Sequence, residues 1–294
     1  MPINASNKNM ASAKYPFFSS YPRVCGVVYA LKSDTIPDKR ISLALASGNE
    51  WEALRIALET TARRHRYIAL CLYFLTKRLH WLPPLAVTLW FCRIIGPASS
   101  WFEYLQRSST RPSLLTATSI YTQLFSKNKK ETGYILDLGC GLGQLPQRFP
   151  RQPHRRWICV DKNFFSLFLA QLYHRRSDII YACADVEIQH LFPKSFFSSA
   201  VCIDCFDFIY QKDSFLRYIA QILKKGGTFV MMNIHEEQPG TELWGYGINR
   251  TEVKKLLLAD FQKITWHDLN FPLHSQKRSL REVDSMRYSF VAYK

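Results

Sequence analysis

Three glycines at alternate positions mark the stretch where a ligand could come closest to the backbone. They are Gly139, Gly141 and Gly143, and they follow the apolar run Tyr134-Ile135-Leu136 within the string Asp137-Leu138-Gly139-Cys140-Gly141-Leu142-Gly143. A strand that runs into glycines can turn tightly, and no Cβ holds a ligand away from those positions. The dinucleotide fingerprint G-x-G-x-x-G also follows a strand, but its spacing is different. The pattern predicts a turn that cradles a nucleotide.

An acidic residue stands where the next strand of such a site would end. Residues 156–160 read as a buried strand, and Asp161 follows them. A carboxylate at this place can accept hydrogen bonds from both hydroxyls of a ribose. The alternative is that Asp161 caps the next helix, which needs no ligand. The glycines upstream favour the ribose.

The D-x-G-x-G-x-G spacing resembles the first motif of the class I S-adenosylmethionine-dependent methyltransferases, and the resemblance covers essentially all of residues 131–294. It implies that the glycine loop lies against the methionine and sugar part of S-adenosyl-L-methionine, with Asp137 at the methionine end. Asp161 would then bind the ribose, and Asp185 matches the acid that usually touches the adenine amino group. The cofactor-binding residues that the resemblance implies are Asp137, Gly139, Cys140, Gly141, Gly143, Asp161, Lys162, Asp185, Val186 and Asp204.

The end of the fourth strand is where this family presents residues to the reacting methyl group. The resemblance implies Asp204, Cys205, Phe206 and Asp207 at this place. Members that methylate bases or glutamine carry an N-P-P-Y-type string here, and cytosine methyltransferases carry a Pro-Cys pair. Neither string is present. Cys205 is therefore not expected to be a nucleophile.

Methyl transfer from a sulfonium is an in-line displacement that chiefly needs alignment of the nucleophile. A base is added when the nucleophile is an unactivated hydroxyl or a protonated amine. The candidate catalytic residues are His235, which follows the fifth strand, and Asp207, which follows the fourth. Glu236 and Glu237 are further candidate bases. The alternative for His235 is a solvated loop histidine.

Strands and helices alternate regularly beyond residue 131. Expected helices span 164–174, 214–224 and 251–258, and expected strands span 134–136, 156–160, 179–182, 199–204, 228–234, 264–268 and 288–292. This alternation predicts an α/β fold with a doubly wound, mostly parallel sheet of seven strands, which binds its ligand at the carboxyl ends of the strands. A closing hairpin and the Gly226-Gly227 turn fit the Rossmann-like class I methyltransferase domain.

Composition divides the chain into three parts. Residues 1–48 are expected to form a basic, flexible leader, residues 49–130 a helical cap region, and residues 131–294 the S-adenosylmethionine-binding domain. The net charge is +16, and residues 1–130 hold 18 Lys and Arg against 6 Asp and Glu. A basic excess of this kind favours anionic partners such as nucleic acid, anionic lipid or an acidic substrate.

The pattern turns helical after Asn49, which could cap the first helix. The apolar runs 67–75 and 81–92 are interrupted by charged residues and by Pro83-Pro84, and neither reaches the ~18 to 20 apolar residues of a spanning helix. No transmembrane segment is predicted. These helices could pack on the core, cover an apolar substrate pocket, or make a peripheral membrane contact in which aromatics enter the interface and cations meet headgroups.

The eight cysteines lie mostly in apolar runs, which indicates reduced thiols and a cytoplasmic location, with an organelle transit peptide as the alternative. Cys202 and Cys205 match C-x-x-C. In a strand, however, residues three apart point to opposite faces, so the pair is not expected to share a metal. No second pair completes a zinc site, and no metal is predicted.

The sequence therefore predicts an S-adenosylmethionine-dependent methyltransferase whose substrate is a small or medium-sized, fairly apolar molecule, such as a specialised metabolite, methylated on oxygen, nitrogen or carbon. The alternative is an RNA methyltransferase whose basic N-terminal region, including Arg63, Arg64 and Arg66, follows the phosphates. A third interpretation is a non-catalytic binding module that kept the cofactor fold. The acids at 137, 161 and 185 argue against it, because a module released from cofactor binding need not keep them.

Overall fold

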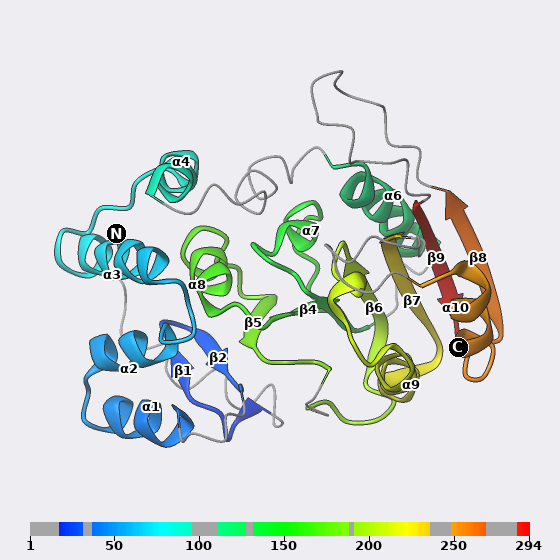
Figure 1. Ribbon diagram of the computed structural model, residues 1–294, viewed down its shortest axis with the longest axis horizontal. Coiled ribbons are helices and arrows are strands. Elements are labelled where there is room, and N and C mark those ends of the chain that lie inside the picture. The colour runs from blue at the N-terminus through cyan, green and yellow to red at the C-terminus, as the bar shows by residue number, and fades with distance from the viewer. Residues whose placement is uncertain are drawn as a thin grey trace.

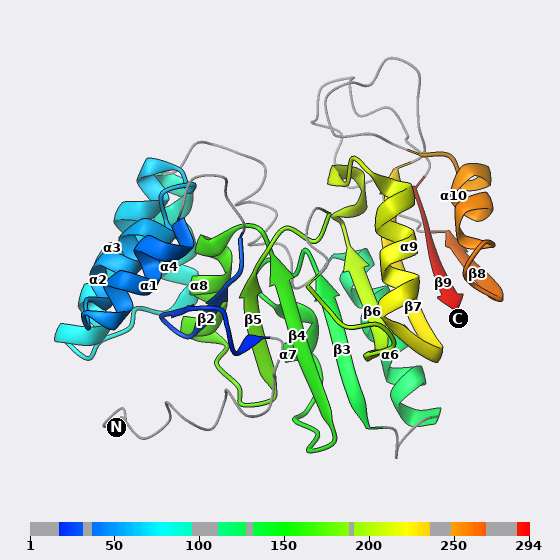
Figure 2. The same cartoon turned by 90° about the horizontal axis from the view of Figure 1, so that it is seen from below.

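The computed structural model describes residues 18–31, 37–95, 111–127, 132–187, 191–235, 248–268 and 287–294. Their strands form one nine-stranded sheet in the order β1-β2-β5-β4-β3-β6-β7-β9-β8 (Figures 1 and 2). The two proposed bases at 236 and 237 lie outside the described residues, as do residues 1–17 of the expected leader.

Seven strands of this sheet are those that the sequence predicts, within two residues at each end, except that the fifth begins five residues earlier than expected and so includes Gly226-Gly227. They are β3 (Gly133–Leu138), β4 (Arg155–Asp161), β5 (Ile179–Cys183), β6 (Phe197–Ile203), β7 (Leu223–His235), β8 (Lys263–Asp268) and β9 (Arg287–Tyr293). Strand β9 is antiparallel to both of its neighbours, and the pairs among β3 to β7 are parallel. The winding reverses at β3, which lies between β4 and β6. In a sheet of this kind ligands bind beyond the carboxyl ends of the strands at that reversal.

Two further strands extend the sheet beyond β5. β1 (Arg23–Val24) and β2 (Val27–Tyr29) form an antiparallel pair, and β2 continues the sheet in parallel with β5. The sequence analysis assigned this stretch to a flexible leader and counted seven strands, so the structure differs on both points. The run Val27–Tyr29 is only three residues long, but all three are buried. Such a short run gives no periodicity from which a strand could be predicted.

Helices cover both faces of the sheet. One face packs against α6 (Pro112–Lys127), α7 (Gln144–Gln147) and α8 (Phe164–Tyr173), whose buried side chains share one apolar cluster. The other face packs against α9 (Lys212–Ile222) and α10 (Arg250–Leu257) through a second cluster. This two-faced covering confirms the predicted doubly wound α/β architecture.

Four N-terminal helices stand beside the sheet instead of over the strand ends. They are α1 (Pro37–Ala46), α2 (Glu50–Ala57), α3 (Arg63–Arg78) and α4 (Leu85–Ile95). Asn49 caps α2 as predicted, because its Oδ1 accepts a hydrogen bond of 3.1 Å from the N–H of Glu52. Figure 2 shows the four helices beyond the β2 edge, next to α8.

Helix α8 explains why α3 and α4 lie there. Its residues 164–170 are all buried, so it is covered on the side away from the sheet as well. The ring of His65 in α3 stacks on Phe165 with centroids 5.1 Å apart. The hydroxyls of Thr88 in α4 and Tyr173 lie 2.6 Å apart. In the described part of the chain, no helix has both the length and the apolarity to cross a bilayer.

Candidate active site

The glycine loop that follows β3 has the backbone geometry that only glycine adopts readily. The φ angle is +64° at Gly139, +52° at Gly141 and +63° at Gly143. A Cβ on Gly139 would collide with Cys205, and one on Gly143 would lie 2.6 Å from the ring of Tyr181. Both outer glycines are thus required by the turn and by the side chains packed against it. Gly141, between them, is half-buried.

Asp161 holds this loop from the end of β4. Its Oδ2 accepts a hydrogen bond of 2.9 Å from the N–H of Gly141, and its Oδ1 accepts one of 2.8 Å from the N–H of Asn163. The cap of α8 is Asn163, whose side chain accepts from the N–H of Ser166. Asp161 is therefore not the helix cap. Burial raises its pKa, although the two backbone donors oppose that shift.

Asp137 lies deeper than Asp161, inside β3. Only 3% of it is exposed, and burial, followed by the charge of Asp161, raises its pKa to about 8. The guanidinium of Arg111 opposes the shift. Asp137 therefore lies close enough to both Asp161 and Arg111 for their charges to shift its pKa. Two other predicted cofactor-binding residues lie nearby in the sequence. Cys140 is half-buried, and burial raises the pKa of its thiol, whereas Lys162 is exposed.

Asp185 and Val186 follow β5 and are half-buried. The Oδ1 of Asp185 accepts a hydrogen bond of 3.0 Å from the N–H of Glu187. Strands β3, β4 and β5 are adjacent and parallel, so their carboxyl ends share one edge of the sheet. The structure therefore brings the glycine loop, Asp161 and Asp185 to the same edge.

Asp204 is enclosed by protein donors at the end of β6. It lies at φ +55°, and its side chain is 5% exposed. Its Oδ2 accepts hydrogen bonds from Nη1 of Arg111 and from Oγ of Ser113 at 2.9 Å, and its Oδ1 accepts one of 2.5 Å from Nδ2 of Asn233. The Nη2 of Arg111 donates to Oε1 of Gln144 at 3.3 Å. The carboxylate is thus held by Arg111, which precedes α6, by Ser113 in α6 and by Asn233 in β7.

Sequence reasoning did not find Arg111, Ser113 or Asn233. Arg111 and Ser113 fall where the sequence shows only a polar break and the next helix, and nothing local connects them to β6. Asn233 did carry a signal, because it is a polar residue inside the apolar strand Met231–Ile234, and it takes a positive φ of +62°. A buried polar side chain in such a run needs a partner.

Asp207 and His235 meet at the ends of β6 and β7. Asp207 lies in the short 3₁₀ helix η4 (Phe206–Phe208), and its Oδ1 accepts a hydrogen bond of 3.3 Å from the backbone N–H of His235. The Nε2 of His235 lies 3.8 Å from Oδ2 of Asp207. Burial raises the pKa of Asp207 to about 7 and lowers the pKa of His235 to about 4, with Arg287 adding to the second shift.

The residues on either side of Asp207 point different ways. Phe206 is fully buried against Phe215, whereas Phe208 is 51% exposed and Tyr210 is 69% exposed. Phe206 therefore belongs to the core and does not face the reacting methyl group, contrary to what the resemblance implied. Two exposed rings thus follow Asp207 in the chain.

The two cysteines of the C-x-x-C string are side by side. The sequence analysis expected them on opposite faces of a strand, which is wrong, because β6 ends at Ile203 and Asp204 takes a left-handed conformation. The chain turns there, and the sulfurs of Cys202 and Cys205 lie 3.2 Å apart. Among the described residues, no group of three or more His, Cys, Asp and Glu side chains could hold a metal ion.

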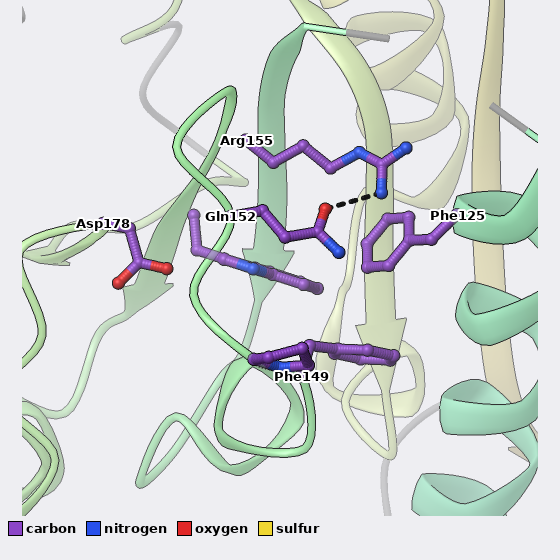
Figure 3. A pocket seen from close by; sticks show the side chains of 7 residues that line it. Phe125, Phe149, Gln152, Arg155 and Asp178 are labelled. Atoms are coloured by element: carbon purple, nitrogen blue, oxygen red, sulfur yellow. Dashed lines mark hydrogen bonds between the residues drawn. The ribbon is translucent and has the colours of Figure 1, made fainter. Parts of the chain in front are cut away.

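A depression at the opposite end of the sheet is filled by packing (Figure 3). The ring of Phe149 stacks on Trp157 with centroids 5.9 Å apart, and the guanidinium of Arg155 lies 4.1 Å from the ring centroid of Phe125. The Nη1 of Arg155 donates to Oε1 of Gln152 at 2.7 Å, as the dashed line in Figure 3 shows. The space between these side chains is too narrow for a small molecule. The candidate site is therefore the carboxyl edge.

The family comparison agrees with this geometry. A family model described as a methyltransferase domain matches residues 136–231, from β3 through the glycine loop to β7. Over these residues the chain is similar to a methyltransferase domain. The match covers Asp137, the three glycines, Asp161, Asp185, Asp204 and Asp207, but stops before His235.

Two solved methyltransferase structures are similar to this chain, and the first of them supports the fold. The CurJ carbon methyltransferase is similar over 87% of this chain and 70% of its own, with 15% identity and a TM-score of 0.52. The 1,6-didemethyltoxoflavin-N1-methyltransferase of Burkholderia thailandensis is similar over 67% of this chain and 84% of its own, with 18% identity and a TM-score of 0.49. No curated protein sequence matches the chain significantly.

Proposed function

We propose that this protein transfers a methyl group from S-adenosyl-L-methionine to a small or medium-sized, fairly apolar molecule. The observation that carries the proposal is the row of three carboxylates, Asp137, Asp161 and Asp185, at successive strands around a loop of three positive-φ glycines. A family model for a methyltransferase domain over the same residues supports it.

The donor and acceptor chemistry of these residues fits the cofactor. S-adenosyl-L-methionine presents an ammonium, ribose hydroxyls and an adenine amino group, all of which donate hydrogen bonds. An ionised carboxylate only accepts, and it has about four lone-pair sites. Asp161 uses two of these for backbone N–H groups, at 2.9 and 2.8 Å, so it can still accept from the ribose. The carboxylate of Asp185, whose Oδ1 accepts from the N–H of Glu187, is an acceptor of the kind that the adenine amino group requires.

The bound cofactor supplies an electrophilic methyl group on a sulfonium. The chain supplies the alignment, and Asp207 supplies a proton acceptor. A carboxyl with a pKa of about 7 is deprotonated in part at neutral pH and is basic enough to accept a proton from an acceptor hydroxyl or ammonium. His235, with a pKa of about 4, stays neutral and positions Asp207 through its backbone N–H.

The exposed rings of Phe208 and Tyr210 support a fairly apolar substrate. They follow Asp207 closely in the chain, and exposed rings of this kind give a planar or aliphatic acceptor a surface to pack against. The described helices of residues 49–95 do not cover this end of the sheet. Among the described residues of the expected cap, Arg111 and Ser113 are the two that bond to Asp204 at the candidate site.

Native mass spectrometry of the freshly purified full chain tests the proposal. We expect an adduct with the mass of the cofactor or its demethylated product, and calorimetry should show binding of both. Asp161→Ala should weaken binding by roughly 1–3 kcal/mol, because a charge-assisted hydrogen bond is lost. Asp213→Ala, at an exposed position on α9, is the control and should bind as the wild type does. A wild-type chain that binds neither compound would contradict the proposal.

A further inference from the structure

The segment from α3 to α4 has an unusual charge composition. Residues 63–95 contain six Lys and Arg and no Asp or Glu. Three of the cations, Arg63, Arg64 and Arg66, lie in the first turn of α3, where the helix dipole disfavours positive charge. The helix dipole therefore does not explain this placement, although Arg66 donates hydrogen bonds to the carbonyls of Glu59 and Thr61. The remaining cations are Lys77 and Arg78 at the end of α3, and Arg93 in α4.

The same segment exposes large apolar side chains. Of the fifteen large hydrophobic residues that are exposed in the described part of the chain, nine lie between residues 67 and 94. They are Tyr67, Phe74, Leu79, Trp81, Leu82, Val87, Trp90, Phe91 and Ile94, which are 37% to 59% exposed. We call these nine side chains, together with Arg63, Arg64, Lys77, Arg78 and Arg93, the α3–α4 surface. Its elements lie at the end of the molecule beyond the β2 edge (Figures 1 and 2).

Packing within the protein does not account for this surface. Helix α3 buries Ala69 and Leu72, and α4 buries Leu89 and Cys92, so each helix already has an inward apolar face. The exposed side chains are additional to those faces. A concentration of large exposed apolar side chains in one segment is typical of an interaction site.

We propose that the α3–α4 surface binds the interface of an anionic lipid bilayer. The proposal does not rest on the methyltransferase activity. Tryptophan and tyrosine favour the headgroup level, leucine and isoleucine enter the acyl boundary, and arginine and lysine meet anionic headgroups. Residues 63–95 contribute no acidic side chain that would repel such headgroups, although Glu50 of α2 lies 2.8 Å from Nζ of Lys77 and offsets that one cation.

Two other occupants fit the surface less well. A second copy of the chain would bring two sets of cations together without acidic partners in this segment. RNA would gain from the cations and the aromatic rings, but not from four exposed aliphatic side chains, Leu79, Leu82, Val87 and Ile94. Moreover, Arg66 donates hydrogen bonds to the carbonyls of Glu59 and Thr61, at 2.6 and 3.1 Å, so this cation helps to anchor its own helix.

Co-sedimentation of the full chain with vesicles tests the proposal. We expect binding to phosphatidylcholine vesicles that contain phosphatidylserine, much weaker binding without it, and quenching of tryptophan fluorescence by brominated lipid. The triple variant Trp81→Ser/Trp90→Ser/Phe91→Ser should lose vesicle binding. The control Leu115→Ser/Leu258→Ser changes leucines that are 49% and 55% exposed elsewhere, and it should bind normally.

A charge variant tests the electrostatic part separately. Arg78→Gln/Arg93→Gln should lower the partition coefficient about 30-fold at low salt, since each cation near an anionic surface contributes about one kcal/mol. Lys254→Gln/Lys255→Gln removes two exposed cations from α10 and should change it by less than about twofold. All the substituted side chains are exposed, so thermal melts should match the wild type.

Several results would overturn the proposal. One is a wild-type chain that ignores anionic vesicles or binds neutral ones equally well. Another is a folded triple variant that still sediments with vesicles. A dimer that the triple variant abolishes, in the absence of vesicle binding, would assign the surface to a second copy. Salt-dependent RNA binding that the triple variant abolishes, again without vesicle binding, would assign it to RNA. Quenching of the wild-type tryptophan fluorescence by brominated lipid needs no variant. It therefore tests membrane binding even if a variant fails to fold.

Discussion

Arg111 donates a hydrogen bond through Nη1 to Oδ2 of Asp204, which lies 93 residues later in the chain. The side chain of Arg111 is 17% exposed and that of Asp204 is 5% exposed, so the pair is largely removed from water. It joins the residue before α6 to the end of β6, beside the glycine loop. The start of α6 is therefore part of the candidate site, although it precedes the expected domain boundary.

Replacing Arg111 by Met is expected to lower the free energy of unfolding by about 3–5 kcal/mol, because the buried carboxylate of Asp204 loses a charged partner. Arg217→Met is the control. It breaks an ion pair with Asp213 in which the side chains are 63% and 52% exposed, and it should change stability little. Urea denaturation of both variants gives the measurement. Equal losses would show that the Arg111–Asp204 pair has no special structural role.

Gly139 in the glycine loop can be compared with Gly48, which lies between α1 and α2. Gly139 and Gly48 have similar φ values, +64° and +75°, but a Cβ on Gly48 would meet nothing within 4 Å, whereas one on Gly139 would lie 2.7 Å from Cβ of Cys205. Gly48→Ala should cost about 1–2 kcal/mol for the left-handed backbone alone. Gly139→Ala should cost a further ~1–3 kcal/mol for the collision. Denaturant midpoints measure the difference, and indistinguishable variants would mean that Cys205 moves aside freely.

Asp207 and His235 should differ in their effect on the pH dependence of turnover. If Asp207 is the base, the rate should rise with pH as its carboxyl loses a proton around its pKa of about 7, and level off above it. His235, with a pKa of about 4, is neutral near pH 7, so its titration should not change the turnover rate there. Asp207→Asn should lower kcat by about 10²–10⁴ and abolish the rise.

His235→Gln is the matched variant, because it keeps the backbone N–H that donates to Asp207. It should retain the rise near neutrality. The measurement is release of the demethylated cofactor in the presence of an acceptor, followed from acid to alkaline pH. If the rise persists in Asp207→Asn and disappears in His235→Gln, the roles are reversed.

The structure agrees with the sequence where a local pattern decides the conformation. The glycine spacing and the apolar runs before Asp137 and Asp161 are such patterns, and the predicted strands and fold class are confirmed. The predictions failed where the partner is distant in sequence. Arg111 approaches Asp204 only because α6 packs on the sheet face, and β2 pairs with β5 across about 150 residues of chain. Neither contact has a periodic signature.

The prediction that Cys202 and Cys205 point to opposite faces failed for a different reason. Alternation of side chains holds only while the strand continues, and Asp204 leaves the strand conformation between Ile203 and Cys205. A positive φ at a residue other than glycine is uncommon, and no sequence rule placed one there.

Truncation tests how far the methyltransferase domain depends on α6. The sequence predicts a domain boundary at residue 130, but the structure leads us to expect that residues 131–294 do not fold alone. Tyr121 of α6 is fully buried, its hydroxyl lies 2.6 Å from Oγ of Ser199, and its ring packs on Trp157 with centroids 5.8 Å apart. Removing α6 uncovers these groups on one face of the sheet, and it leaves Asp204 without Arg111 and Ser113.

A chain of residues 131–294 should therefore be insoluble or melt without cooperativity, because the uncovered face exposes apolar side chains to water. The control is a chain of residues 18–294, which keeps every described element and should melt cooperatively. Circular dichroism and cofactor calorimetry on both chains provide the measurement. A 131–294 chain that melts cooperatively and binds cofactor as tightly as the control would place the boundary at residue 130 after all. In that case α6 would be an accessory to the sheet, and its contacts with Ser199 and Trp157 would be dispensable for folding.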